Sequence, residues 1–189
     1  MYLKTERLIL RPWQEEDKEP FARLNADREV MRYFPSVLTR EKSDALIDIA
    51  RERTQEDGFC FSPIEEKETG TFLGFVGLSR PRYAKPLPFD PCVEIGWRLA
   101  RAAWGKGYAT EAARAWIGFG FETLGLDEIV SFTAVSNERS QRVMERLGMH
   151  RDPQDDFLHP AIEPSHPLAP HVLYRLPRSD WKHTLTVSP

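Results

Sequence analysis

The sequence predicts an α/β fold in which a central mixed sheet carries helices on both faces. Segments with the two-residue period of strands dominate early, and strands then alternate with segments of helical period. Residues 93–115 combine both periods around a glycine turn. The predicted order is β-α-α-β-β-β-α-β-α-β-β, and the later strand–helix alternation predicts parallel strands in the second half of the sheet.

The bulk composition fits one globular domain spanning residues 1–189. Of its residues, 41% are hydrophobic and 29% charged, which allows a sizeable core. A net charge of −3 predicts no nucleic-acid partner. Without a membrane-spanning run or a signal-peptide pattern, we expect a cytoplasmic protein with no membrane role. Cys60 and Cys92 are expected to be small buried hydrophobes, and a disulfide is the alternative.

The first half of the chain predicts three strands and two main helices. The strands have alternating apolar residues and lie at 5–12, 59–66 and 71–79. The helices lie at 14–25 and from Thr39 to Gly58. Pro63 indicates an edge strand or a bulge. Residues 80–91 contain four prolines and are expected to form a loop.

The second half predicts four strands and two helices. The strands lie at 93–99, 128–135, 149–157 and 171–176. One helix runs from Gly107 to near Gly125, and the other covers 137–147 and stops at Gly148. The segment 159–170 is proline-rich and is expected to be irregular.

The turn Trp104-Gly-Lys-Gly-Tyr-Ala109 joins a predicted strand to a predicted helix. Its two glycines let the backbone curl tightly and come close to a ligand. The free N–H groups and the positive end of the following helix point into the turn. This arrangement predicts a phosphate site, and the alternative is an ordinary strand-to-helix connection that needs glycine for its geometry.

Four motifs occur in order along nearly the whole chain. They are Thr5-x-Arg7-Leu8-x-Leu10-Arg11-Pro12, Gly74-x-x-Gly77, Glu94-Ile-Gly-Trp followed by Trp104-Gly-Lys-Gly-Tyr-Ala-Thr-Glu-Ala112, and Asn137-x-x-Ser140-x-x-Val143-Met144-x-x-Leu147-Gly148-Met149. Together they resemble the GNAT superfamily of acetyl-CoA-dependent N-acetyltransferases. The resemblance is closest to the branch that contains the Rim-type ribosomal-protein acetyltransferases.

The resemblance implies a mostly antiparallel, twisted sheet of about seven strands, splayed between the fourth and fifth strands. The splay would open a slot for the thioester. The family's pyrophosphate loop, Gln/Arg-x-x-Gly-x-Gly/Ala, maps onto Trp104-x-x-Gly107-x-Ala109, with Trp104 in place of Gln or Arg. The implied pyrophosphate contacts are Trp104, Gly105, Lys106, Gly107, Tyr108, Ala109 and Thr110. The implied pantetheine contacts are Ile95, Trp97 and Leu99.

The implied reaction moves an acetyl group from acetyl-CoA to a primary amine by direct attack. Glu94 is the candidate base, acting directly or through a water, because burial could raise its pKa. The alternative is a carboxylate on a solvated strand face or one paired with Arg98 or Arg80. His171 is an alternative base.

Asn137 and Ser140 stand in the first turn of the late helix. Asn137 suits the N-cap position, and the resemblance also implies that its NH₂ group contacts the cofactor. Ser140 is the candidate general acid or hydrogen-bond donor at the thiolate, where many members of the superfamily use a tyrosine. The positive helix end would stabilise the same thiolate.

The remaining candidates concern the acceptor side. His159, His166 and His171 have irregular spacing, so we expect no metal and a place in the acceptor groove instead. The acidic residues Asp155, Asp156 and Glu163 favour a cationic amine, unless they belong to a merely polar surface loop. An aromatic wall is a further possibility, with core packing as the alternative for each member: Trp13, Phe34, Tyr83 and Phe157.

Two other functions compete with acetylation of a small amine. One is a protein Nα-terminal acetyltransferase of the ribosomal-protein type, and the other is a non-catalytic CoA-binding module. We expect either a monomer or a homodimer. The sequence does not specify the acceptor, because its groove is built from loops.

Overall fold

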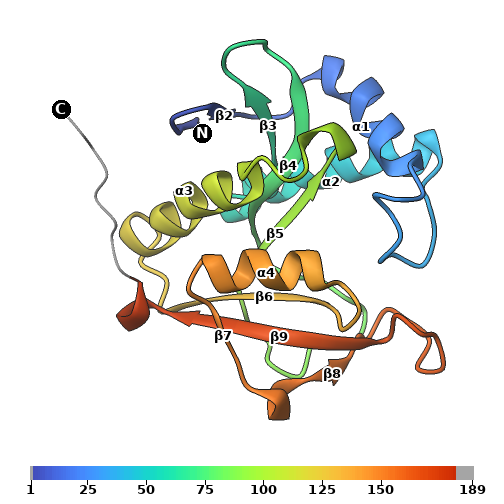
Figure 1. Cartoon of the computed structure of the whole chain (residues 1–189), viewed down its shortest axis with the longest axis vertical. Helices are drawn as coiled ribbons and strands as arrows, with labels where there is room; N and C mark the ends of the chain where they lie inside the picture. Colours follow the sequence, from blue (N-terminus) through green and yellow to red (C-terminus); the bar gives the residue numbers. More distant parts are fainter. Residues whose placement is uncertain (1, 182–189) are drawn as a thin grey trace.

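The computed structural model describes residues 2–181 and contains a nine-stranded sheet (Figure 1). The strand order is β1-β2-β3-β4-β5-β6-β9-β7, and β8 pairs with β9. The strands are β1 (Leu3–Lys4), β2 (Leu8–Leu10), β3 (Ser62–Glu66), β4 (Phe72–Ser79), β5 (Glu94–Leu99), β6 (Glu128–Ala134), β7 (His150–Arg151), β8 (Phe157–Leu158) and β9 (Pro170–Pro177).

Helices cover both faces of the sheet, as predicted. They are α1 (Lys18–Ala26), α2 (Arg40–Asp57), α3 (Tyr108–Glu122) and α4 (Glu138–Arg146). Apolar residues of α1 and α2 pack with Phe75 of β4 in one cluster. Apolar residues of α3 and α4 pack on the other face, against Ile95 and Leu99 of β5. Figure 1 shows α3 and α4 together on the near side, with α2 behind the strands.

Several local signals place the elements where the sequence predicts them. Thr39 caps α2 by accepting a hydrogen bond from the Lys42 N–H, and Gly58 ends the helix in the left-handed conformation. Asn137 caps α4 in the same way. The predicted helix at 14–25 begins as a 3-10 turn, Glu15–Asp17, which leads into α1.

The prediction of parallel strands in the second half of the sheet is wrong for all pairs but one. Strand β5 pairs with β6 in parallel, whereas β6, β7 and β8 each pair antiparallel with β9. The alternation β6–α4–β7 does give β6 and β7 the same direction. Strand β9 then inserts between them and runs the opposite way, so the mostly antiparallel sheet implied by the resemblance is confirmed.

One predicted strand is split in two, and one short strand precedes the first predicted strand, which accounts for nine strands instead of about seven. The segment 149–157 breaks because Pro153 starts a 3-10 turn capped by Asp152, which leaves β7 and β8 on either side. The additional strand, β1, lies before the predicted start at Thr5, and a turn in which the Thr5 N–H donates to the Leu8 carbonyl joins it to β2.

The sheet is splayed between β5 and β6, the fourth and fifth strands of the predicted order. The two strands share one bridge, Glu94 opposite Val130, and diverge beyond it. The Val130 N–H donates to the Val93 carbonyl at 2.9 Å, so odd-numbered residues of β5 direct their backbone polar groups toward β6. The Trp97 backbone therefore faces the opening between the strands.

Two further expectations concern the thiols and the membrane. Cys60 is buried as predicted, Cys92 is half-buried, and both are free thiols. Within residues 2–181, no helix has the length and apolar character needed to cross a membrane.

Candidate functional site

One continuous cleft of about 2550 Å³ follows the splay and reaches both faces of the sheet. The pocket lining includes the glycine turn, the start of α3, one side of α4, and β5 from Glu94 to Leu99. On the other face of the sheet it includes residues of the α1–α2 loop. The sequence-predicted candidates Glu94, Ser140, Asn137 and the 104–110 turn all line this cleft.

The glycine turn has the conformation that the sequence predicts. Gly105 and Gly107 have φ angles of 74° and 83°, in the left-handed region that favours glycine. Gly107 is the N-cap of α3. The first backbone hydrogen bond of the helix runs from the Glu111 N–H back to the Gly107 carbonyl. The N–H groups of the first helical turn are therefore free of intrahelical partners and available to an anion.

A cluster of hydrogen bonds ties this turn to the start of the chain. The Glu111 carboxylate accepts from the Thr5 hydroxyl at 2.5 Å, from the Arg7 backbone N–H at 2.8 Å and from Arg7 Nε at 2.7 Å. Arg7 Nη1 also donates to the Lys106 carbonyl at 3.0 Å. The Thr5-x-Arg7 motif is visible in the sequence but this role is not, because the partners lie about a hundred residues apart in sequence.

Trp104 holds the turn from the other end. Its indole N–H donates to the Leu99 carbonyl at 2.9 Å, which fixes the turn against the end of β5. The Arg139 guanidinium lies 4.8 Å from the centroid of the indole ring. Trp104 thus has a structural role that explains how it can replace the usual Gln or Arg of the loop.

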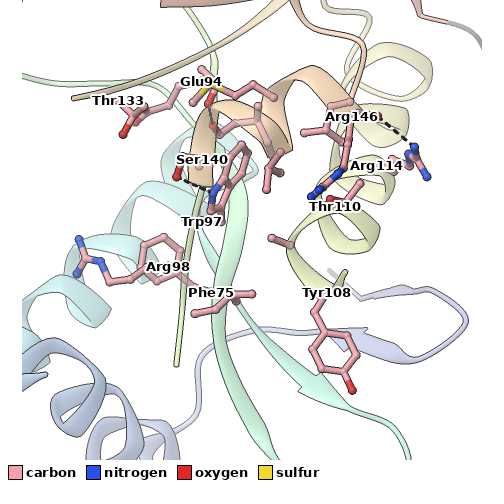
Figure 2. Close-up of a pocket in the computed structure, with 18 of the residues that line it drawn as sticks. Phe75, Glu94, Trp97, Arg98, Tyr108, Thr110, Arg114, Thr133, Ser140 and Arg146 are labelled. Carbon is pink, nitrogen blue, oxygen red and sulfur yellow. Dashed lines mark hydrogen bonds between the residues drawn. The ribbon is translucent and has the colours of Figure 1, made fainter. Parts of the chain in front are cut away.

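The side of the cleft next to α3 and α4 has more cationic than anionic side chains. The cations that line it are Arg7, Lys106, Arg114, Arg139, Arg142 and Arg146, and the anions are Glu111, Glu122 and Asp180. Arg114 Nη2 donates to the Arg146 carbonyl at 3.1 Å, which links the two helices (Figure 2). Such a rim suits a polyanionic ligand that lies along the opening.

Glu94 is half-buried at the point where β5 and β6 part. Burial raises the pKa of this carboxyl to about 8, and the Asp90 charge adds to the rise while the Arg53 charge opposes it. Within residues 2–181, Glu94 forms no ion pair with Arg98 or Arg80. The structure therefore shows neither of the two ion pairs given as alternatives for this carboxylate.

Ser140 lies at the centre of a hydrogen-bond network above the splay (Figure 2). Its Oγ accepts from Trp97 Nε1 at 3.3 Å and from Asn137 Nδ2 at 3.0 Å. Because both lone pairs of the hydroxyl oxygen are engaged, its O–H is left to act as a donor. The other Asn137 N–H donates to Thr133 Oγ1 at 2.9 Å, so the Asn137 amide orients Ser140, and its contact with the cofactor stays a prediction.

The predicted histidines separate into two groups. His159 and His171 line the cleft with ring centroids 4.8 Å apart, whereas His166 lies outside it. Burial lowers the pKa of His159 to about 4 and lowers that of His171, so both are neutral at neutral pH. Within residues 2–181, no group of three or more His, Cys, Asp or Glu residues could hold a metal ion.

The acidic residues of the late loop do not face the cleft. Asp155 pairs with Arg175 at 2.7 Å, and Asp156 pairs with Arg151 at 2.5 Å. Glu163 is exposed and lies outside the cleft. The expectation that these residues select a cationic amine is therefore wrong, and the merely polar surface loop is correct.

The predicted aromatic wall is only partly present. Phe34 and Tyr83 line the cleft, and the Tyr83 ring lies 4.7 Å from that of His159. Trp13 is buried in the core instead, with its ring 4.9 Å from Phe21, and Phe157 packs on Phe89.

Comparison with known proteins identifies the protein family to which the chain belongs. The fold is similar to that of a solved acetyltransferase from Agrobacterium tumefaciens, with 29% identity, a TM-score of 0.74, and coverage of 93% of this chain and 94% of that one. Residues 7–150 match the model described as Acetyltransferase (GNAT) domain, and the chain belongs to this family. It is therefore an acyltransferase, and GNAT acetyltransferases use acetyl-CoA as co-substrate.

Two curated relatives are similar to this chain, one over most of its length and one over a shorter segment. The FsC-acetyl coenzyme A-N(2)-transacetylase of Aspergillus fumigatus is 31% identical over 192 residues, which is 95% of this chain and 77% of that protein. A Bacillus subtilis protein, YdaF, named as a ribosomal N-acetyltransferase, is 44% identical over 55 residues, or 29% of this chain and 30% of that one. The resemblance to the Rim-type branch is thereby confirmed.

The raised pKa of Glu94 predicts a pH-dependent gain in stability when the charge is removed. In the folded protein Glu94 ionises only near pH 8, whereas in the unfolded chain it ionises near its ordinary value of 4.5. The unfolded state therefore releases a proton first, and the free energy of unfolding falls as the pH rises through this window. We expect Glu94→Gln to raise the melting temperature by several degrees at pH 9 and not at pH 4, measured by circular dichroism. A difference independent of pH would contradict the assignment.

Proposed function

We propose that the protein transfers an acetyl group from acetyl-CoA to a primary amine by direct attack. The observation that carries this proposal is the adjacency of the glycine turn to the β5–β6 splay. A pyrophosphate at the turn would direct the pantetheine arm into the opening beside the Trp97 backbone. The printed name of the Aspergillus fumigatus relative, which contains acetyl coenzyme A, supports the same donor.

The proposed donor site begins at the turn. The backbone N–H groups from Gly105 to Thr110 bind the pyrophosphate, and the left-handed glycines let the phosphates approach the backbone closely. Lys106 and the arginines of α3 and α4 contribute positive charge around it. Trp104 shapes the turn through its bond to Leu99.

The pantetheine arm would take the place of a neighbouring strand beside β5. Of the three expected contacts, the Ile95 carbonyl already accepts from Ser131 Oγ at 2.9 Å, and the Leu99 carbonyl accepts from Trp104. The Trp97 backbone is therefore the best placed to bond the amide groups of the arm.

Glu94 is the proposed base. The amine nitrogen attacks the thioester carbon, the C=O bond opens to an oxyanion, and an N–H proton moves to the Glu94 carboxylate, directly or through a water. A pKa near 8 suits this role, since a base is most effective when its pKa lies near the working pH. Burial lowers the pKa of His159 to about 4, which makes its ring a weak base at neutral pH.

Ser140 is the proposed donor at the leaving group. Collapse of the tetrahedral intermediate breaks the C–S bond and leaves a thiolate. The Ser140 O–H, oriented by Trp97 and Asn137, donates a hydrogen bond to that sulfur. The N-terminal end of α4 adds a favourable dipole.

A matched pair of glycine variants tests the donor site. Gly105 and Gly125 have similar φ angles, 74° and 68°, and no atom lies within 4 Å of a Cβ added at either. Alanine at either position should therefore destabilise the fold by a similar amount, about 1 kcal/mol. We expect Gly105→Ala to weaken acetyl-CoA binding at least about tenfold by calorimetry, because its methyl group would keep the phosphates from the backbone.

Gly125 lies in the loop after α3, outside the cleft, so Gly125→Ala should bind acetyl-CoA like the wild type. Equal losses in the two variants, or no binding by the wild type, would overturn the proposed donor site.

The pH dependence of kcat/KM tests the base. With one amine acceptor, the wild-type kcat/KM should rise with pH through an apparent pKa near 8, because only the Glu94 carboxylate accepts a proton. Glu94→Gln should abolish this pH-dependent rise and lower kcat/KM by about 100-fold or more. The separate rise that reflects deprotonation of the acceptor's own amine should remain. Loss of the first rise in His171→Gln but not in Glu94→Gln would instead identify His171 as the base.

A further inference from the structure

Arg98 is a half-buried cation that lines the cleft on the side of α1 and α2, and its Nε atom is fully buried. It lies on β5, and its side chain projects from the face opposite to that of Trp97, toward α1 and α2 (Figure 2). The Arg98 Nη1 atom donates to Asn25 Oδ1 at 2.6 Å. Within residues 2–181, the guanidinium forms no ion pair with a carboxylate, and its buried Nε–H has no hydrogen-bond acceptor.

This arrangement is energetically unfavourable without a counter-ion. Burial lowers the pKa of Arg98 to about 10, so the group is still charged at neutral pH. A buried charge that lacks an oppositely charged partner destabilises a protein strongly. The fold nevertheless holds the group in place, because Asn25 is fully buried and its Nδ2 donates to Ser43 Oγ at 2.8 Å.

Two aromatic rings lie beside the Arg98 guanidinium. The central carbon of Arg98 lies 4.2 Å from the Phe34 ring centroid and 5.4 Å from that of Phe75. Rings that stack on guanidinium faces do not use its in-plane N–H donors. Such a planar set of donors matches a carboxylate, which binds edge-on through two oxygens.

Arg98 and Glu94 share one face of β5 with Gly96 between them. Four residues of a strand separate their Cα atoms by about 13 Å. Gly96 has no side chain, and the Phe61 ring occupies the space beside it, since a Cβ there would lie 2.9 Å from the ring. A ligand that reaches from the base to the guanidinium would therefore pass over the Phe61 ring, which lines the cleft.

The other titratable groups that line this side of the cleft do not neutralise Arg98. His159 and His171 have lowered pKa values and carry no negative charge. Glu29 pairs with Arg32 at 3.7 Å in the α1–α2 loop.

We propose that Arg98 binds a carboxylate of the acceptor, so that the acceptor is an amine that also carries a carboxylate group. The inference rests on the proposed function, and it names the substrate class of the same site. The amine end lies toward Glu94 and the thioester, and the carboxylate end lies at Arg98.

The test compares acceptors that differ only in charge. Amino acids and ω-amino acids of increasing length are each paired with the corresponding primary amide, and thiol release from acetyl-CoA is followed with the full chain. The best acid should exceed its amide at least tenfold in kcat/KM. Arg98→Gln should abolish this preference by raising KM for the acid. It should keep kcat/KM for the amide within about threefold of the wild-type value and leave acetyl-CoA binding unchanged. Arg98→Lys should restore part of the preference.

Arg32→Gln is the matched control. Arg32 also lines the cleft, but it is exposed and pairs with Glu29, so this variant should keep the acid preference. Melting curves establish that each variant is folded. The comparison of acids with amides in the wild type tests the proposal even if a variant does not fold. If turnover is too slow to measure, binding of N-acetylated acids and amides to the CoA complex gives the same comparison.

The inference is wrong if amides equal or exceed their acids, if no acid is acetylated or bound, or if Arg98→Gln lowers acids and amides alike. It is also wrong if peptides without a nearby carboxylate are the preferred acceptors. Failure of acetyl-CoA to bind in calorimetry would overturn the proposed function itself, which separates the two failures.

Discussion

The single bridge between β5 and β6 is the constraint on which the rest of the site depends. The strands meet at Glu94 and Val130, with Ser131 Oγ holding the Ile95 carbonyl at 2.9 Å just before they part. Parallel strands that stayed paired would use the Trp97 backbone in the sheet and close the cleft. Because they diverge, the base candidate lies at the apex of the opening, and Ser140 in the first turn of α4 accepts a hydrogen bond from Trp97 further along β5.

The glycine turn is useful only because it is held rigidly at both ends. Glu111 is bound by Thr5 and Arg7 at the start of α3, and Trp104 is bound to the end of β5. A ligand that binds at fixed N–H groups loses less free energy to ordering the protein. The same reasoning applies on the acceptor side, where Ser43 and Asn25 hold Arg98 before any ligand binds.

The sequence predicts the features that arise locally. Thr39 and Gly58 mark the ends of α2, and the glycine turn signals its own conformation because few other residues adopt positive φ. Features that depend on distant segments are not predictable in this way. The insertion of β9 between β6 and β7 reverses the expected strand pairing, and Arg98 meets Asn25 across 73 residues of sequence. Neither contact leaves a periodic signal.

The most direct test of the account is a map of where CoA binds. Backbone amide spectra of the ¹⁵N-labelled protein, recorded with and without CoA, report on each N–H separately. The largest changes should fall on residues 105–110 and on Trp97, with little change along α2. Changes concentrated on α2 or spread evenly over the chain, or no change at saturating CoA, would contradict the claim that the splay and the glycine turn form one donor site.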